Sequence, residues 1–340
     1  MVFPHRLVGT QTRGYRTVTA GLRALRRRIL TPALSSTSLD VRGFRKKNPT
    51  SQQLLETVGR SFLEGYGRIV EAPDARAAEP RLEAVPREFR GFAYEGAAMA
   101  CSIMDALPGS KGQRLSGLLA GRGGAHTYMA YVGIGWAMAR LPRLLHPGIE
   151  KTDPLLRWLI LDGYGFHQAY FRTARYVHGQ HREQKLPWPQ HQASYAQRAV
   201  DQGIGRALWF VGGTDVDAVV TLAEAFPPAR RGDLYSGVGL AATYAGGAGA
   251  DELLRLRDSA GVYRPQLLQG SAFAAEAREQ AGLTVPHTQL ATEVLCGMKP
   301  HEAAGVCREL RPGASDRVDA ATYETWRQHI AGALVSEGRS

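Results

Sequence analysis

A short phrase rich in glycine recurs along the chain at nearly regular intervals. It reads QGIGRALWFVGG from Gln202 and SGVGLAATYAGG from Ser236, so the leading glycines, Gly203 and Gly237, lie 34 residues apart. Looser copies recur at intervals of roughly thirty to forty residues and begin at Glu95, Val132, Asp162 and Gln269. This spacing is typical of repeats built from pairs of α-helices, and it constrains the fold more than any other feature of the sequence.

The small residues of the phrase fall in fixed columns. Counted from the first glycine, position zero is glycine in every copy: Gly96, Gly133, Gly163, Gly203, Gly237 and Gly270. Position two is also small throughout: Ala98, Gly135, Gly165, Gly205, Gly239 and Ala272. Position four is alanine in every copy except one, which has His167. Positions zero and four share one helix face, and each helical glycine costs about 1 kcal/mol, so the columns predict helices in close contact. The phrase LEGYGRIVEA, with Gly65 and Gly67, is a candidate seventh copy.

The repeats predict an all-α fold, a tetratricopeptide-like right-handed array of helix pairs, with a closed α/α toroid as the alternative. The first helix of each pair carries the phrase and ends at a glycine pair or proline. The second follows directly, as over residues 215–226 and 250–259, with Thr214 or Asp215 as N-cap of the former. The predicted organisation is a basic N-terminal arm over residues 1–47, a repeat array over 48–283 and capping helices over 284–340.

The segments outside the phrases give three local predictions. Thr50 or Ser51 is expected to cap a helix over residues 53–70. Residues 73–86, bounded by prolines, are expected to form a loop. The C-terminal part is expected to form one final helical pair from the segments LATEVLCGM and AATYETWRQHIAGAL.

The net charge of +11 is concentrated at the N-terminus. Residues 1–47 hold 11 Lys and Arg against the single Asp40, which leaves 31 basic and 30 acidic residues in a nearly neutral body. A basic arm of this kind accounts for the high isoelectric point, so nucleic acid is not an expected partner. No run of eighteen apolar residues occurs, which predicts no membrane span. With 3 cysteines and no CxxC spacing, the chain is expected in a reducing compartment, the cytoplasm.

The arm contains an amphipathic basic helix. Its apolar residues, Val18, Leu22, Leu25 and Ile29, recur at helical spacing among arginines. It lacks the apolar run of a secretory signal. Two interpretations stand: the helix docks on an acidic partner or an anionic membrane surface, or it is a solvated helix packed on the first repeat.

The residue before the first glycine is polar in most copies. These residues are Glu95, Asp162, Gln202, Ser236 and Gln269, with Val132 as the apolar exception. Because stacked repeats align equivalent positions, this column is expected to line a ligand-binding groove together with the residues three places after the glycine, among them Trp136, Phe166 and Arg206. The alternative is that these polar residues satisfy neighbouring helix ends.

His167 is the strongest candidate for chemistry, because it replaces the alanine of the other copies. With Asp162 it forms a candidate acid–base pair, the alternative being a hydrogen-bonded core histidine. Extended as one helix, the segment also carries His178 and His181, which are weak candidates for two metal ligands. His167 is about 21 Å from His181 along such a helix, so no single ion can bind all three. No metal site is therefore predicted.

Several nucleotide and hydrolase signatures do not occur in the chain. It has no GxxxxGK[ST] loop, no HExxH and no GxSxG, and the GVGLAA sequence from Gly237 belongs to the repeat series rather than to a dinucleotide fingerprint. Arg206, Arg230 and Arg231 with Asp233 are candidates either to hold an anionic group or to pair at a repeat junction. The sequence specifies no cofactor.

The phrases RGFAYEGAAMACSIMDALPG, YVGIGWAMARLP, DGYGFHQAYF, DQGIGRALWF and RGDLYSGVGLAATYAGG resemble those of the UnbL-type family, bacterial proteins encoded in enediyne polyketide biosynthesis clusters. The resemblance covers roughly residues 20 to 335. It implies a role in enediyne antibiotic biosynthesis, with companion proteins of the cluster, after the polyketide synthase has made a linear polyene. It carries no catalytic residue over to this chain.

Two functions are compatible with these observations. In the first, the protein is an enzyme or auxiliary enzyme that binds the apolar polyene intermediate in its groove on the way to the enediyne core. In the second, it is a non-catalytic helical-repeat scaffold whose basic arm engages an acidic carrier protein or synthase. Whether the protein is an enzyme is left open by the sequence.

Overall fold

The computed structural model describes residues 32–149, 152–186, 188–189, 193–313 and 319–337. Within these ranges every regular element is helical and no strand occurs, so the predicted all-α class is confirmed. The amphipathic segment over residues 18–29 lies outside the described residues. No helix in the described ranges is both long and apolar enough to cross a bilayer.

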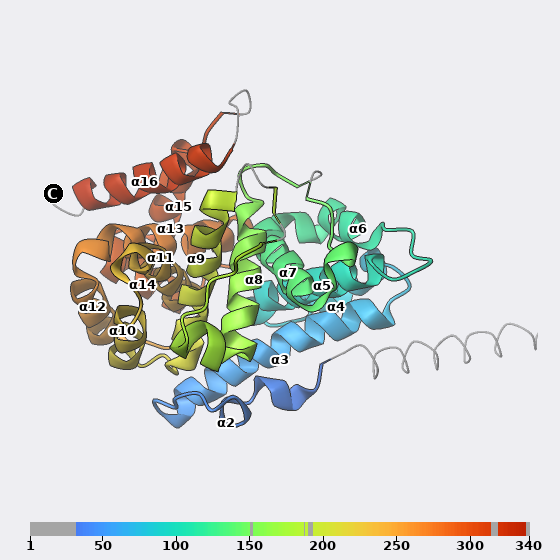
Figure 1. Ribbon diagram of the computed structural model, residues 1–340, viewed down its shortest axis with the longest axis horizontal. Helices are drawn as coiled ribbons and strands as arrows, with labels where there is room; N and C mark the ends of the chain where they lie inside the picture. The colour runs from blue at the N-terminus through green and yellow to red at the C-terminus, as the bar shows by residue number, and fades with distance from the viewer. Residues whose placement is uncertain (1–31, 150–151, 187, 190–192, 314–318, 338–340) are drawn as a thin grey trace, which may run out of the picture.

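The helices that carry the glycine phrase pack side by side in chain order (Figure 1). They are α3 (Pro49–Glu71), α5 (Arg87–Asp105), α7 (Thr127–Arg140), α8 (Trp158–Phe171), α9 (Ala193–Val211), α11 (Pro228–Ala245) and α13 (Arg264–Gln280). We call them the glycine helices. Shorter helices form a second layer, in which α10 packs on α12 and α12 on α14: α4 (Ala75–Glu83), α6 (Arg114–Ala120), α10 (Val216–Glu224), α12 (Ala250–Ser259) and α14 (Pro286–Cys296).

The remaining elements lie between these helices or cap the array. Short ones are η1 (Leu34–Thr37), α2 (Leu39–Arg42), η2 (Arg122–His126), η3 (Arg143–Leu145), η4 (Ala174–His178) and η6 (Gly261–Tyr263). At the C-terminal end, α15 (Pro300–Glu309) and α16 (Ala320–Glu337) pack on α13. The pairing of helices is regular from α9 onward, with Asp215 as the N-cap of α10. The described parts of the segments that join α7, α8 and α9 hold η3 and η4 as their regular elements.

Three local predictions are wrong. Asn48, rather than Thr50 or Ser51, caps α3, because its side chain accepts a 2.8 Å hydrogen bond from the backbone N–H of Ser51. Residues 73–86 contain α4 rather than a loop, since Asp74 accepts a 2.9 Å hydrogen bond from Ala77 N and starts a helix in an alanine-rich segment. The C-terminal part forms α14, α15 and α16 rather than one pair, because Pro300 occupies the first turn of a further helix.

The glycine columns mark direct contact between helix backbones. An ideal Cβ built on any first-column glycine would lie 1.8 to 2.2 Å from a carbonyl oxygen of the preceding glycine helix. At Gly203, for example, that oxygen belongs to Asp162, at 1.8 Å. The glycines of the second column approach the following helix in the same way, as Gly205 does at 2.1 Å from Leu234 O. No side chain fits at these positions, which explains why the helices accept the intrinsic cost of glycine.

The candidate seventh copy belongs to the array, but its register differs from the prediction. Gly65 in α3 faces the carbonyl oxygen of Ala93, three residues before Gly96. Gly135 bears this same relation to Ile160, three residues before Gly163. Gly65 therefore occupies the second column, two residues from where matching EGYG to the DGYG of the Asp162 copy would place it.

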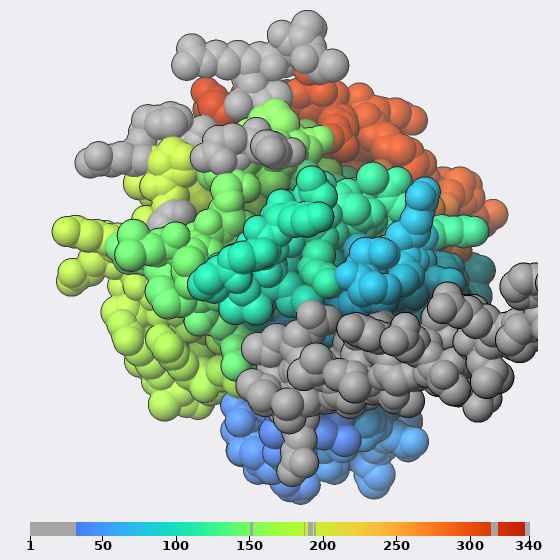
Figure 2. Space-filling view, turned by 90° about the vertical axis from the view of Figure 1, so that its right-hand side faces the viewer, coloured from blue at the N-terminus to red at the C-terminus, as the bar shows by residue number. Residues whose placement is uncertain are grey.

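The array curves until its last glycine helix, α13, reaches the second one, α5. Arg278 at the end of α13 donates a 3.0 Å hydrogen bond to the carbonyl oxygen of Glu88 at the start of α5, and Arg87 donates a 2.6 Å bond to Gly282 O. One continuous apolar core runs from Leu39 to Leu334. The fold thus combines stacked helices with the closing contact of the toroid alternative. Figure 2 shows residues of the first half of the chain, blue to green, gathered on one face with the C-terminal helices at its edge.

Candidate functional site

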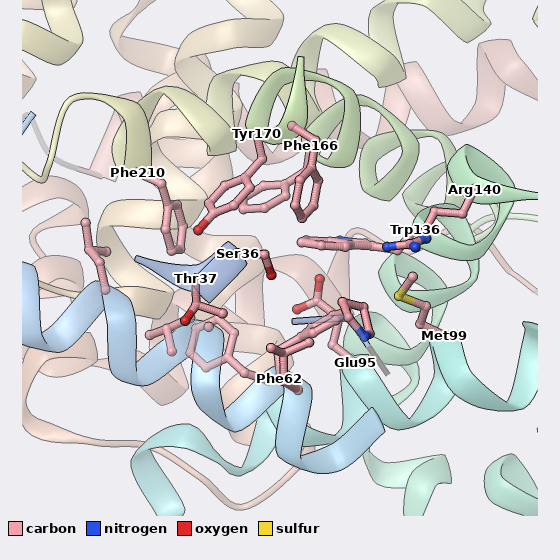
Figure 3. Close-up of a pocket in the computed structure, with 17 residues that line it drawn as sticks. Ser36, Thr37, Phe62, Glu95, Met99, Trp136, Arg140, Phe166, Tyr170 and Phe210 are labelled. Atoms are coloured by element: carbon pink, nitrogen blue, oxygen red, sulfur yellow. The ribbon is translucent and has the colours of Figure 1, made fainter. Parts of the chain in front are cut away.

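An apolar cavity lies between α3, α5, α7, α8 and α9, under the segment that contains η1 (Figure 3). We call it the aromatic pocket. The space inside it that can hold the centre of a water-sized sphere is about 50 Å³, and all space between its lining atoms, open solvent at the mouth included, is about 590 Å³. Aromatic rings make up much of its wall: Phe62, Phe92, Trp136, Phe166, Tyr170, Phe171 and Phe210. Trp136 is central, with ring centroids 4.4 Å from Phe62 and 5.3 Å from Phe166.

The repeat register explains how these rings come together. Positions three and seven after the first glycine are one helical turn apart and share a face. In α7 these positions hold Trp136 and Arg140, in α8 Phe166 and Tyr170, and the seventh position of α9 is Phe210; all of them line the aromatic pocket. The sequence analysis used position three and missed Tyr170, Arg140 and Phe210. Extending the same column by four residues would have found them.

Glu95 is the one acidic side chain in the wall of the aromatic pocket. It is 3% exposed, and its carboxylate points into the space beside Phe62 (Figure 3). No hydrogen bond of usual length and angle reaches Glu95 from the described part of the chain, but the indole N–H of Trp136 lies close enough to lower the pKa of this carboxyl group. Burial raises the pKa of Glu95 to about 7, with the charge of Asp162 adding to the rise and that of Arg206 opposing it. Glu95 can therefore exchange a proton near neutral pH.

Arg206 connects this carboxyl group to a second one. Its Nη1 donates a hydrogen bond to Asp162, which is 1% exposed, and its guanidinium lies over the ring of Phe166 at 5.1 Å. Gln202 Nε2 donates a 2.9 Å hydrogen bond to the other carboxylate oxygen of Asp162. Asp162 is thus held as a paired carboxylate, whereas Glu95 interacts with Arg206 through space only. Of the two carboxyl groups near Arg206, Glu95 is the one free to act on a ligand.

The rest of the polar column forms a buried chain of hydrogen bonds, which we call the polar ladder. Gln202, Ser236 and Gln269 are each at most 1% exposed. Ser236 Oγ donates to Gln269 Oε1 at 2.8 Å and approaches Gln202 Oε1 at 3.4 Å, and Arg327 of α16 donates to Gln269 Oε1 at 3.2 Å. Equivalent positions therefore align as expected, but these side chains face each other across helix interfaces and not an open groove. Of the predicted groove residues, Glu95, Trp136 and Phe166 line the aromatic pocket.

His167 lies behind the wall of the aromatic pocket. Its ring centroid is 4.7 Å from that of Phe171 and 5.4 Å from that of Trp136, and neither ring nitrogen has a hydrogen-bond partner in the described residues. Burial, reinforced by the charges of Arg140 and Arg172, lowers the pKa of His167 to about 3. The imidazole is thus neutral at pH 7, and no hydrogen bond joins it to Asp162.

His178 and His181 do not continue the helix of His167. Helix α8 ends at Phe171, η4 covers Ala174–His178, and Gln180 then turns the chain with a φ of 50°. The single helix from His167 to His181 was therefore wrong. His181 Nε2 lies 2.6 Å from Arg175 Nη2, while His178 is exposed. In the described ranges no group of three or more His, Cys, Asp or Glu side chains is placed to hold a metal ion.

The other candidate anion site is occupied by ion pairs. Arg230 donates to both carboxylate oxygens of Asp201, at 2.9 and 2.7 Å, and Asp233 pairs with Arg198 and Arg327. Arg231 donates to the carbonyl oxygen of Phe226 at 2.7 Å. Arg230 and Asp233 thus form ion pairs at a repeat junction, which is the second of the two expected roles, whereas Arg231 binds backbone carbonyl oxygens.

The chain belongs to a family described as proteins of unknown function, DUF1702, whose model matches residues 21–334. No curated protein and no solved structure matches the chain.

Proposed function

We propose that this member of the DUF1702 family binds an extended, apolar conjugated chain in the aromatic pocket and exchanges a proton with it through Glu95, as a step of enediyne antibiotic biosynthesis. The observation that carries the proposal is the single unpaired carboxyl group inside an aromatic cavity. The link to enediyne biosynthesis rests on the resemblance of the glycine phrases to the UnbL-type family.

The wall of the pocket suits a flat, electron-rich ligand. The rings of Phe62, Trp136 and Phe166 follow one another at centroid distances of 4.4 and 5.3 Å and are tilted by 35° and 32°. Aromatic rings at this spacing offer faces and edges on which a conjugated chain can stack, and burying such a chain is favoured by its apolar area. A linear polyketide-derived polyene, the intermediate implied by the family resemblance, has this chemistry.

Glu95 gives the pocket a way to act on the chain. A carboxyl group with a pKa of about 7 holds and releases a proton with similar ease at neutral pH. Removing a proton from one carbon of a conjugated chain and returning it to another carbon shifts the double bonds, and atoms and electrons balance without a further reactant. Arg206 favours the carboxylate form of Glu95, which takes the proton in the first transfer and is restored by the second; between the two transfers Glu95 is the neutral acid.

A fluorescence titration tests the binding step. Trans-parinaric acid, a conjugated tetraene that becomes fluorescent in apolar surroundings, is expected to bind the full chain in a saturable way. Val58→Phe fills the cavity from a side chain that is 4% exposed and should abolish binding, whereas Leu144→Phe, at a position that is 98% exposed, should leave it unchanged. Thermal melting of each variant checks that it is folded. Equal binding by both variants would contradict the proposal.

A genetic test separates an enzyme from a scaffold. In the organism that encodes the protein, loss of the gene is expected to stop enediyne output and to accumulate a linear polyene. Glu95→Gln keeps the shape of the side chain but cannot transfer a proton, so it should fail to restore output. If Glu95→Gln restores output fully, the acid–base role is wrong, and the non-catalytic scaffold that binds a carrier protein or synthase becomes the better proposal. Deleting residues 1–31 then tests whether the basic arm makes that contact.

A further inference from the structure

The mouth of the aromatic pocket is positively charged. Most of its lining residues are buried, and those with substantial exposure are Pro32, Ser36, Gly59, Phe171 and Arg140. Arg140 is the exposed one and the only charged residue among them. It lies four residues after Trp136 on α7, about 6 Å along the helix axis, so a positive charge stands one turn from the aromatic wall.

Two further arginines stand beside the same rim. The guanidinium of Arg42 lies over the ring of Phe171, 5.1 Å from its centroid, and Arg172 directly follows Phe171 at the end of α8. Arg140 and Arg172 both lie close enough to His167 to lower its pKa. We call Arg42, Arg140 and Arg172 the rim arginines.

The rim arginines have no acidic partner among the described residues. None of them forms an ion pair with a described Asp or Glu, and Arg42 Nε is buried without a hydrogen-bond partner. The buried Arg206 and Arg230, by contrast, pair with Asp162 and Asp201. Glu56 is close enough to Tyr170 for its charge to raise the pKa of that tyrosine. Its carboxylate already accepts hydrogen bonds from Leu39 N and from Gln52 Nε2, both at 3.1 Å. Positive charge at the rim is therefore left uncompensated within the described chain.

We infer that the rim arginines bind the anionic end of the ligand whose apolar chain occupies the aromatic pocket. This inference rests on the proposed function and specifies its substrate as an amphiphile, an apolar chain that carries a carboxylate or phosphate at one end. Guanidinium groups recognise both anions through charge-assisted hydrogen bonds, and these strengthen where an apolar wall excludes water. The anion then fixes which end of the chain enters first, and so which carbons reach Glu95.

Binding of the full chain to trans-parinaric acid and to its uncharged methyl ester tests the inference at low ionic strength. The acid is expected to bind at least tenfold more tightly than the ester. Arg140→Gln combined with Arg172→Gln should weaken the acid to the level of the ester and leave the ester unchanged. Both positions are exposed, so the variant should fold, as circular dichroism can check. Arg264→Gln, an exposed arginine on α13 away from the pocket, is the matched control.

The source of the anion is resolved by competition. Decanoate and decyl phosphate present a carboxylate and a phosphate at the end of apolar chains of equal length; displacement of the probe by either supports the inference, and the stronger competitor identifies the preferred anion. Equal affinity for acid and ester, or no loss of acid binding in the double arginine variant, would overturn the inference alone. Absence of binding by both probes would instead refute the proposed function on which it rests.

Discussion

Replacing Glu95 by glutamine should stabilise the protein at pH 8 but not at pH 4.5. The folded state holds Glu95 at a pKa of about 7 against an ordinary value of 4.5. Between these values the folded protein binds the proton of Glu95 more tightly than the unfolded chain, so the contribution of Glu95 to wild-type stability falls as the pH rises through this window. A difference of about 2.5 pKa units corresponds to about 3 kcal/mol at 1.36 kcal/mol per unit. Glutamine does not ionise, so the variant escapes this loss.

Urea unfolding of wild-type protein and Glu95→Gln at intervals from pH 4.5 to pH 8 measures the effect. The difference in unfolding free energy should grow with pH and level off above about pH 7, in favour of the variant. A direct titration of the labelled Glu95 carboxyl carbon by NMR should give an apparent pKa near 7. A difference that stays constant across the range, or a midpoint near 4.5, would refute the claim that burial without a hydrogen-bond partner controls this group.

Further consequences follow from the close packing and the buried charges. Gly203→Ala should destabilise the protein by about 3 kcal/mol or more, because its Cβ would lie 1.8 Å from Asp162 O. In Gly332→Ala, in α16, the new Cβ would meet no neighbouring side chain or helix within 4 Å, so this change should be neutral or stabilising by up to about 1 kcal/mol. Chemical denaturation can measure both effects. Arg206→Gln removes the partner of Asp162 and should cost about 3–5 kcal/mol and raise the pKa of Glu95 further, visible in the same NMR titration. Burial lowers the pKa of His126, His167 and His287 to about 3 or 4, so the unfolded chain takes up protons on these histidines at a higher pH than the folded protein does. Their contribution to stability should therefore fall as the pH drops from about 6.5 toward 4. Replacing any one of them by alanine should make the melting temperature fall less between these two pH values than it does in the wild type.

The glycine columns allowed the all-α fold to be predicted from the sequence. A contact in which a neighbouring carbonyl oxygen lies where a side chain would be leaves glycine as the only choice, and it does so at the same place in each unit. The glycine column therefore marks the positions at which neighbouring helix backbones touch. Local boundaries were less readable, because Asp74 and Pro300 start helices in segments whose prolines also suit loops.

The sequence predicted correctly that the polar residues of the column align, but not what surrounds them. Alignment of Gln202, Ser236 and Gln269 follows from the repeat, and so does their mutual hydrogen bonding. Whether such a column faces a ligand or a neighbouring helix depends on how far the array curves. The contact between Arg278 and Glu88, residues 190 positions apart, sets that curvature, and no periodicity in the sequence reveals it.

The next residue in the column explains why Glu95 differs from the other members. Asp162, Gln202 and Ser236 each meet a polar residue on the next glycine helix, but the residue that follows Glu95 in the column is Val132, which offers no hydrogen bond. Glu95 is left without a partner where the large side chains of α3, α7 and α8 surround a cavity. An apolar residue within an otherwise polar column thus releases one carboxyl group from the ladder. Val132→Gln should re-engage Glu95, lower its pKa toward the ordinary value and weaken the proton exchange while leaving parinaric acid binding in place; an unchanged Glu95 titration in the folded variant would argue against this origin of the site.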